Sequence, residues 1–358
     1  MHPFTKSGRK RRAVGARTAR VVVATALALS LAACRDPFPT PRPTAAAPGV
    51  SSGPEPTAPA PSPTNGPTIL PVPKAVATIS VGPEFAGTEA VVVGEGSAWA
   101  GSALGPMAQI DPTTNESTPF SLTPDDFFER GASALAVGDG VVWAVLNDEQ
   151  GRLFRIDPSS NQVLGSIPVG RNPNDLALAD GSLWVVVGGE GVVAQVDPAT
   201  NAVTARVPVP GASRVTALGS EVYVTDGDGV VAIDPSTASV TRRLSVDGPV
   251  DAIASLNGEL WVGGAAGESP FVHVVDPASG EVVQSVALPE GPSALAAGPG
   301  DMWAVDRLHD QACRILPANV PLVTCVAAGP QPVAVTFGEG AVWVANHDDA
   351  TVTRIEPA

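Results

Sequence analysis

The sequence predicts an all-β fold, a seven-bladed β-propeller of four-stranded antiparallel blades over residues 74–358. Two sequence features that repeat with the same period support this prediction. An aromatic residue recurs every 38 to 44 residues, at Trp99, Trp143, Trp184, Tyr223, Trp261, Trp303 and Trp343. An Asp-Pro pair or a close variant follows each aromatic residue, as at Asp157-Pro158. A fixed period near forty residues is typical of a ring of four-stranded repeats.

Each repeat is predicted to hold four short strands. An Ala- and Val-rich run leads through a glycine turn, as at 138–140, into the strand with the aromatic residue. Gly, Asn and Asp supply the positive φ that such hairpins need. A third strand ends at Asp-Pro, which suits a type I turn, and a fourth strand leaves that turn, as at 202–209. We expect the first strands, which carry small side chains, to line the central axis of the propeller. We expect the aromatic residues to fill the space between neighbouring blades.

The two ends of the predicted ring complement each other. The last repeat stops at Ala358, soon after its Glu356-Pro357 turn, and lacks a fourth strand. Residues 74–81 match the fourth-strand pattern and precede the first repeat. We therefore expect the segment around Ile79 to pair with the strand around Val352. This N-terminal strand would close the last blade and remove exposed sheet edges.

The first 73 residues have a different character. Residues 1–33 combine a basic start with a short apolar run, as secretory signal peptides do. Leu31-Ala32-Ala33-Cys34 resembles the bacterial lipobox, and this resemblance implies lipidation of Cys34. Residues 35–73 include 13 prolines and cannot bury enough surface to fold. We expect residues 34–73 to form a disordered tether, and the protein to lie at the extracytoplasmic face of a bacterial cell membrane, its lipid anchor in that membrane. The general and twin-arginine export routes both stay open.

The cysteines and the net charge indicate which covalent links and which partners to expect. Cys313 and Cys325 flank the turn of the sixth repeat, and an exported protein favours a disulfide between them. A metal site with two cysteines is the weaker alternative, since no histidine accompanies them in a ligand spacing. The net charge of −15 is the wrong sign for a nucleic-acid-binding protein. We expect a monomer.

The repeats resemble those of a known family. Residues 222–226, 342–346 and 195–209 look like the YVTN-type β-propeller repeat, and more loosely like the repeats of NHL and virginiamycin B lyase propellers. The resemblance covers nearly all of residues 74–358. It implies an extracytoplasmic binding or scaffold protein, since only a minority of such propellers are enzymes.

Polar residues occupy the position ten residues before most of the aromatic residues. With one apolar exception, Val333, they are Glu89, Ser133, Asn174, Ser213, Asp251 and Ser293. The start of a strand that faces a solvated channel is often polar, but this ring also suits a small ligand. Glu89 and Asp251 are candidate ligands for Ca²⁺ or Mg²⁺, although no cofactor is required. Asp175 and Arg214, one residue further along, are expected to form an ion pair between neighbouring blades. The pair is also a candidate to anchor the ligand, although a structural role is the favoured one.

Two histidines are candidates for chemistry. His309 and His347 lie among carboxylates in loops of adjacent repeats, an arrangement that suits acid–base or metal chemistry, although most loop histidines are only solvated. The resemblance to virginiamycin B lyase implies a metal-assisted elimination.

These observations favour a lipid-anchored binding or interaction module. Its ligand, a protein, small molecule or glycan, is expected at the funnel face that points away from the membrane. A metal-dependent lyase or hydrolase at the same face is the alternative, and a surface scaffold or sensor is a third.

Overall fold

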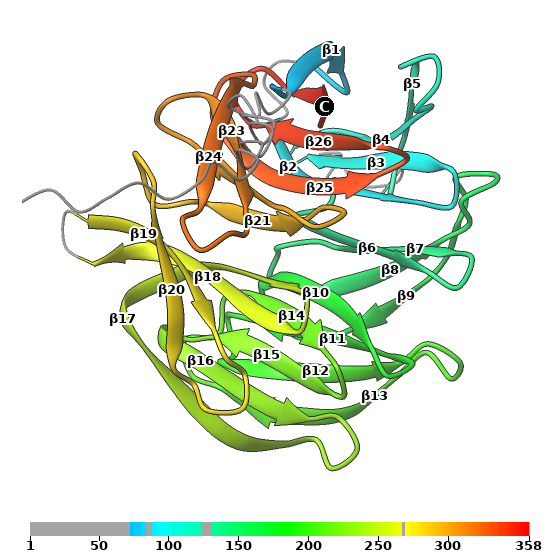
Figure 1. The fold of residues 1–358 in the computed structure, drawn as a ribbon. Helices are drawn as coiled ribbons and strands as arrows, with labels where there is room; N and C mark the ends of the chain where they lie inside the picture. The colour runs from blue at the N-terminus through cyan, green and yellow to red at the C-terminus, as the bar shows by residue number, and fades with distance from the viewer. Residues whose placement is uncertain (1–71, 84–86, 103, 124–130, 267–268, 358) are drawn as a thin grey trace, which may run out of the picture. The chain divides into compact units, whose positions relative to one another are not determined.

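The computed structural model describes residues 72–83, 87–102, 104–123, 131–266 and 269–357. Throughout these ranges the chain forms strands joined by turns (Figure 1). No helix long and apolar enough to cross a membrane occurs in them. The expected signal peptide, Cys34 and most of the tether lie outside the described residues.

Four of the sheets in the described ranges are four-stranded antiparallel meanders, as expected for single repeats. The first comprises β2 (Thr88–Gly94), β3 (Ser97–Ser102), β4 (Met107–Ile110) and β5 (Ser117–Phe120). The second comprises β6 (Ala134–Gly138), β7 (Val141–Val145), β8 (Arg152–Ile156) and β9 (Val163–Pro168). The third comprises β10 (Pro173–Ala179), β11 (Ser182–Val187), β12 (Val192–Asp197) and β13 (Ala202–Pro208). The fourth comprises β21 (Ala294–Ala297), β22 (Met302–Asp306), β23 (Gln311–Leu316) and β24 (Leu322–Ala327).

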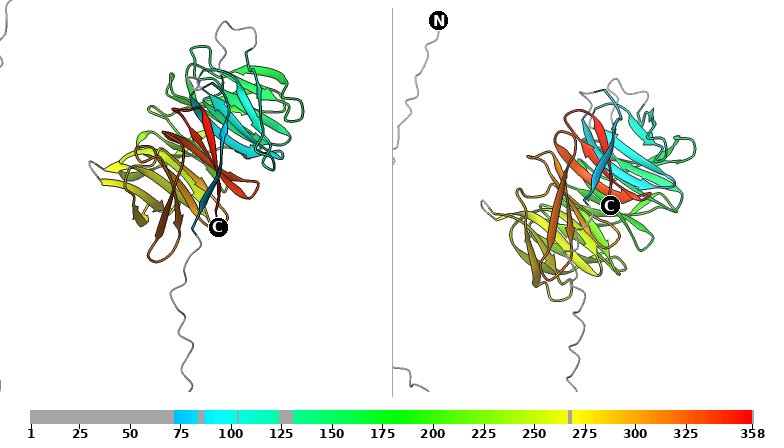
Figure 2. Two further views of the ribbon diagram at one scale, coloured as in Figure 1. Left: turned by 90° about the horizontal axis from the view of Figure 1, so that it is seen from above. Right: turned by 45° about the horizontal axis from the view of Figure 1, so that its top comes forward.

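Another four-stranded sheet joins the two ends of the described chain. Its strands lie in the order β1 (Lys74–Ser80), β27 (Thr351–Glu356), β26 (Ala341–Asn346) and β25 (Pro332–Gly338). β1 pairs antiparallel with β27 and places Ile79 opposite Val352. Both views in Figure 2 show the blue strand β1 beside the red C-terminal strands. The N-terminal strand therefore occupies the fourth-strand place in this sheet.

The remaining sheet differs from the expectation of separate four-stranded units. It has seven strands: β14 (Val215–Leu218), β15 (Glu221–Thr225), β16 (Gly227–Asp234), β17 (Ser239–Leu256), β18 (Glu259–Ala266), β19 (Ser269–Val275) and β20 (Val282–Ala287). The first half of β17 pairs with β16 and the second half pairs with β18. Gly248, with a φ of 91°, lies between the halves. One long strand thus serves two consecutive repeats.

The first strands of the repeats contact one another in a closed cycle. β2 contacts β6, and the contacts continue through β10, β14, β17, β21 and β25 back to β2. The seven aromatic residues follow the same cycle and are at most 2% exposed. Trp99, for example, packs with Val142 and Ala144 of the next repeat, and Trp343 packs with Ala98 and Ala100 of the first. The expected role of the aromatic residues between neighbouring repeats is confirmed.

The Asp-Pro turns are held by local hydrogen bonds. The hydroxyl and the backbone N–H of Ser159 donate to Asp157 Oδ1, and these bonds lower the pKa of that carboxyl. Asn161 closes the same turn with a φ of 59°. The carbonyl oxygen of the turn proline is left free to accept a bond from elsewhere.

Side chains of the preceding repeat use this acceptor. Gln109 Nε2 donates to the Pro158 carbonyl at 3.2 Å, and Gln195 Nε2 donates to the Pro235 carbonyl at 3.2 Å. Arg314 donates to the Pro357 carbonyl at 2.9 Å. These bonds tie consecutive repeats together at the turns, beside the aromatic packing.

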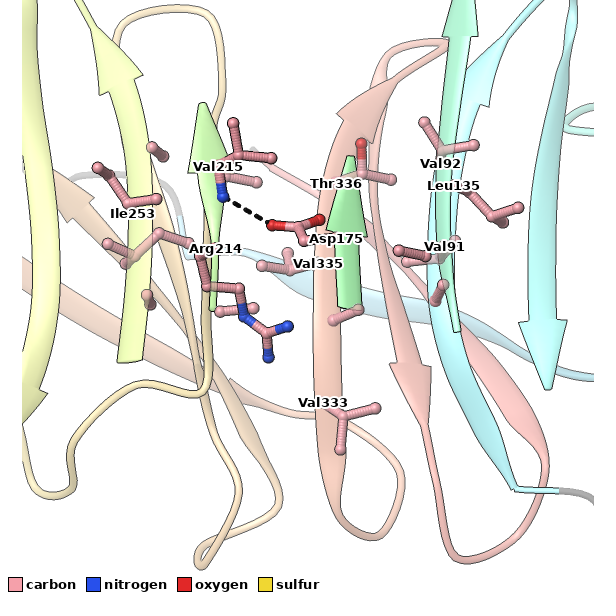
Figure 3. A pocket seen from close by; sticks show the side chains of 18 of the residues that line it. Val91, Val92, Leu135, Asp175, Arg214, Val215, Ile253, Val333, Val335 and Thr336 are labelled. Atoms are coloured by element: carbon pink, nitrogen blue, oxygen red, sulfur yellow. Dashed lines mark hydrogen bonds between the residues drawn. The ribbon is translucent and has the colours of Figure 1, made fainter. Parts of the chain in front are cut away.

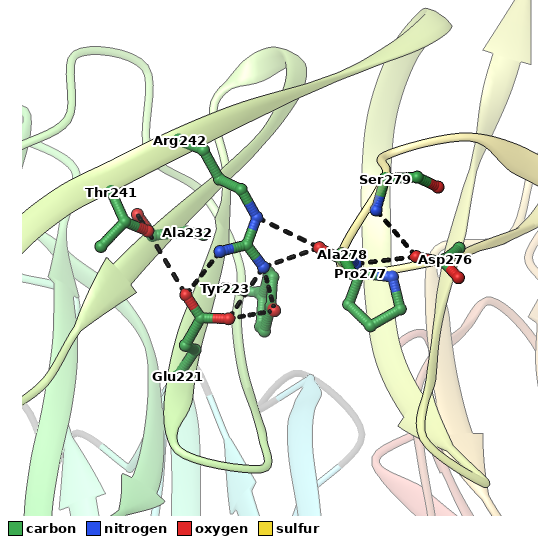
Figure 4. Close-up of polar contacts among 9 residues, drawn as sticks. All are labelled: Glu221, Tyr223, Ala232, Thr241, Arg242, Asp276, Pro277, Ala278 and Ser279. Carbon is green, nitrogen blue, oxygen red and sulfur yellow. Dashed lines mark hydrogen bonds and ion pairs between the residues drawn. The ribbon is translucent and has the colours of Figure 1, made fainter.

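The fourth repeat has a more extensive version of this link, shown in Figure 4. Arg242 forms a bidentate ion pair with Glu221 and also donates to the Pro277 carbonyl of the next repeat. Arg242 Nη2 donates to the hydroxyl of Tyr223 at 2.9 Å, and that hydroxyl donates to Glu221 at 2.8 Å. Burial and the bond to Glu221 raise the pKa of Tyr223 to about 12, so the phenol keeps its proton at neutral pH. The one Tyr among six Trp is therefore explained by a hydroxyl that the network uses.

The predicted disulfide is present. Cys313 on β23 lies directly opposite Cys325 on β24, and the two are bonded.

We predict that Arg242→Met lowers the free energy of unfolding by about 1–2 kcal/mol, because Glu221 and the Pro277 carbonyl lose a partly buried charged donor. Urea denaturation of the full-length chain measures this loss. The matched control is Arg206→Met, since Arg206 makes one ion pair with Glu190 and is 40% exposed. We expect that change to cost less than about 1 kcal/mol. Equal losses in the two variants would show that the network adds nothing beyond a surface ion pair.

Candidate functional site

The first strands surround a cavity. Its inner part, of about 320 Å³, is lined by residues from β2, β6, β10, β14, β17, β21 and β25. Its mouth, of about 620 Å³, shares several residues with the inner part, including Glu89, Asn174 and Arg214. The two parts therefore form one continuous space along the axis of the contact cycle.

The polar ring predicted from the sequence gathers at this mouth. Every member lines it: Glu89, Ser133, Asn174, Ser213, Asp251, Ser293 and the apolar exception Val333. Loops that follow the aromatic strands add Asn147, Arg307 and Leu308, and the connection into β21 adds residues 290–292. We did not single out Glu290 or Arg307 as site residues from the sequence. Only their place in a loop between strands points to them.

The serine hydroxyls of the ring are engaged within the protein. Ser133 Oγ donates to the Val145 carbonyl at 3.2 Å, and Ser293 Oγ donates to the Pro332 carbonyl at 3.2 Å. The Ser213 hydroxyl lies 2.7 Å from the Thr225 hydroxyl. These serines hold strand starts to their neighbours, which makes them weaker ligand donors than the sequence implied.

Asp175 and Arg214 do not form the expected ion pair (Figure 3). Asp175 Oδ2 accepts a bond from the Val215 backbone N–H at 3.0 Å, and Oδ1 accepts one from the Leu176 N–H at 2.9 Å. No ion pair of Arg214 is present among the described residues, and its guanidinium points into the cavity. The expectation was wrong because two backbone donors, which sequence spacing does not reveal, take the carboxylate.

The environment of Asp175 disfavours its charged form. Asp175 lies in the wall of the inner cavity and is partly buried. Burial raises the pKa of this carboxyl, while Arg214 and the N–H groups of Val215 and Leu176 act in the opposite direction. The carboxyl links β10 to β14 through the Val215 N–H.

The two candidate histidines lie outside the cavity wall. His309 Nδ1 contacts Asp306 Oδ2 at 2.8 Å, and its side chain is 52% exposed. His347 lies 3.4 Å from Glu89 and 3.1 Å from Asp348. Only His347 therefore contacts a residue of the ring, and nothing brings the two imidazoles together at one reacting centre.

The candidate cation ligands Glu89 and Asp251 both line the mouth. Among the described residues, however, no group of three or more His, Cys, Asp or Glu side chains is arranged to hold a metal ion. Glu89 and Asp251 are therefore not joined by a third carboxylate, histidine or cysteine ligand among these residues.

Comparison with known proteins addresses the fold. No family model matches the chain, and no curated protein matches it. Virginiamycin B lyase from Staphylococcus aureus superposes with a TM-score of 0.66 at 16% identity, over 78% of this chain and 99% of the lyase. The WD40 repeats of RRP9 superpose with a TM-score of 0.69 at 10% identity, over 80% of this chain and 100% of that one. The fold is a β-propeller. Identities this low show the propeller fold alone.

We predict that the stability cost of Asp175→Asn falls as pH rises. Because the pKa of Asp175 is raised in the folded state, the folded protein keeps a proton that the unfolded chain loses above its ordinary pKa of 3.8. The wild type therefore loses stability as pH rises from about 4 through that raised pKa, whereas the Asn variant does not. Urea denaturation of both proteins at a series of pH values from 3.5 to 7 measures the difference.

At the lowest pH of the series, the free energy of unfolding of the Asp175→Asn variant is expected to be about 1–3 kcal/mol below that of the wild type. The reason is that the NH₂ group of the new side chain faces a backbone N–H donor. A cost that grows with pH would instead indicate a carboxylate paired with Arg214.

Proposed function

We propose that this protein is an extracytoplasmic, lipid-anchored, seven-bladed β-propeller that binds its ligand in the axial cavity. One observation carries the binding function. The polar residues that recur at one position of the repeat converge on a single cavity mouth. A pocket of a few hundred Å³ with a small number of convergent polar groups is the usual form of a small-molecule site.

The seven-bladed arrangement is supported by the closed cycle of first-strand contacts. If β17 is divided at Gly248, the seven-stranded sheet yields two blades of four strands each. The pairing of β1 with β27 then closes the ring at the last blade. A closed ring leaves the axial cavity as the common meeting point of all blades.

The anchoring is supported by the sequence of residues 1–73, in particular the apolar run that ends at Cys34. Lys74 lies opposite Glu356, next to the turn at Pro357. The tether accordingly leaves from the turn side of the blades, and the cavity mouth, formed by the other ends of the first strands, faces away from the membrane. A ligand from outside the cell then reaches the mouth freely, and a protein or glycan partner is accommodated on the same face.

A lyase or hydrolase is the second candidate. It is favoured by the superposition on virginiamycin B lyase and by the contact of His347 with Glu89 at the ring. Among the described residues no group of three His, Cys, Asp or Glu side chains is arranged to hold the metal that such chemistry implies, and His309 is not part of the cavity lining. Binding without turnover is therefore the better account of this site.

We predict that obstructing the mouth abolishes ligand binding. Val333 is the apolar member of the ring, so Val333→Phe fills space without removing a polar contact. The full-length chain is to be screened by ligand-detected NMR against L-amino acids, monosaccharides, nucleosides and polyamines. Binding of any probe that occupies the cavity is expected to weaken at least about tenfold in this variant.

The matched control is Val323→Phe on the outer strand β24, where Val323 is 38% exposed. Binding that survives both changes equally, or no binding by any class of probe, would refute the cavity as the ligand site.

We predict that Cys34→Ser releases the protein from the membrane. In a bacterial host fed a tagged fatty acid, the wild type is expected to carry the label and to sediment with membranes. The Cys34→Ser variant is expected to lose both properties. The control is the double variant Cys313→Ala with Cys325→Ala, which loses the disulfide and should keep the label. A labelled Cys34→Ser protein in the membrane fraction would exclude this anchor.

A further inference from the structure

Arg214 occupies a fixed position at the cavity. Its backbone N–H donates to the Thr225 hydroxyl at 3.0 Å, and its carbonyl accepts a bond from the Thr225 N–H at 3.0 Å. The side chain lines both the inner cavity and the mouth. Figure 3 shows its guanidinium in the open space between first strands. The backbone at the start of β14 therefore holds a charged, planar donor group in the wall of the proposed binding site.

No acceptor within the described residues takes the guanidinium of Arg214. Several other arginines of the domain have one, such as Glu221 for Arg242 and Asp301 for Arg314. The nearest candidate in the cavity wall, Asp175, has its two oxygens turned to backbone N–H groups. A half-buried guanidinium keeps its charge at any physiological pH. Arg214 acts on Asp175 through the electric field, but no ion pair of its guanidinium is present among the described residues.

The side-chain amide of Asn174 offers further donors beside Arg214. Asn174 precedes Asp175 on the neighbouring first strand β10, and its amide makes no hydrogen bond within the described residues. Gly188 leaves room for this amide, since a Cβ at that position would lie 2.4 Å from Asn174 Nδ2. A guanidinium and an amide on adjacent strands are suited to a planar anionic group such as a carboxylate.

The mouth has more carboxylates than cations. Glu89, Asp251 and Glu290 line it together with the guanidinium groups of Arg214 and Arg307, and the whole chain carries −15. A bare anion that approaches Arg214 passes these carboxylates and is repelled. A ligand that also carries a positive group is attracted to them.

We propose that the cavity binds a small zwitterion, such as an amino acid, with its carboxylate on Arg214 and Asn174 and its ammonium toward Glu89 and Asp251. This inference rests on the proposed binding function and names the chemical class of its ligand. An inner space of about 320 Å³ below a wider mouth suits a molecule of this size.

Three matched probes test the two ends of the ligand separately. L-leucine carries both charges, 4-methylpentanoate lacks the ammonium, and L-leucinamide lacks the carboxylate. Calorimetric titration of the full-length chain is expected to give binding of leucine, weaker binding of 4-methylpentanoate and no measurable binding of leucinamide. Higher salt is expected to reduce the difference between the first two.

The Arg214→Met variant is expected to weaken leucine binding by about tenfold to a hundredfold, since a hydrogen-bonded charged donor is lost. The Arg214→Lys variant keeps the positive charge but loses the planar pair of N–H donors, and it is expected to weaken leucine binding at least about threefold. The matched control is Arg307→Met. Arg307 also lines the mouth, but its guanidinium donates to Gln331, so little change is expected. Unchanged thermal melting shows that each variant is folded.

The outcomes separate this inference from the proposed function. Leucinamide that binds as tightly as leucine, or leucine binding that Arg214→Met leaves unchanged, overturns the role of Arg214. Equal binding of leucine and 4-methylpentanoate overturns the zwitterion. Probes of other classes that bind and are excluded by Val333→Phe, with no binding of leucine, would overturn the inference and leave the proposed function standing. No binding of any probe would overturn both.

Discussion

The fold depends on one repeated interaction, the packing of each buried aromatic residue against the next repeat. Trp143, for example, shares a cluster with Leu176 and Val185, and Trp303 shares one with Val342 and Val344. Each large ring buries apolar surface that its own four strands cannot cover, so no repeat is complete alone. Because Trp343 packs onto the first repeat, the same requirement is met at both chain ends.

The polar bonds to the turn prolines complement this packing at one edge of the blades. Apolar contacts hold two sheets together without fixing their relative slide, whereas a hydrogen bond has a defined direction. Gln109 and Gln195 each reach a carbonyl that the adjacent Asp-Pro turn has left free. The register between neighbouring blades is thus set by side chains opposite the aromatic residues, since Gln109 pairs with Trp99 and Gln195 with Trp184.

Much of this architecture was predictable because its determinants are local and periodic. The hairpin turns, the Asp-Pro turns and the buried aromatic residues follow from residues within one repeat, and so does the placement of the polar ring at the mouth. The continuity of β17 was missed, since Asp247-Gly248-Pro249 has the composition of a break yet stays within an extended strand. The ion pair predicted between Asp175 and Arg214 was wrong for a different reason. Asp175 accepts a hydrogen bond from the backbone N–H of Val215, which is distant in the sequence, and no side-chain pattern reveals such a partner.

The separation between the aromatic clusters and the axis has a consequence for the site. The clusters lie between blades and include some of the small residues that line the inner cavity, such as Ala252 and Ala254. The polar residues at the mouth are not members of these clusters, so they are free to differ between repeats. An uncompensated guanidinium is unfavourable in a core, but it is tolerated where it borders a solvated cavity. The first strands are also held apart by the width of the ring, so a short acidic side chain on one blade does not reach a cation on the far side. A cavity at the axis therefore holds opposite charges such as Arg214, at the start of β14, and Glu89, on β2, in one space without pairing them. A ligand that carries both charges can contact both.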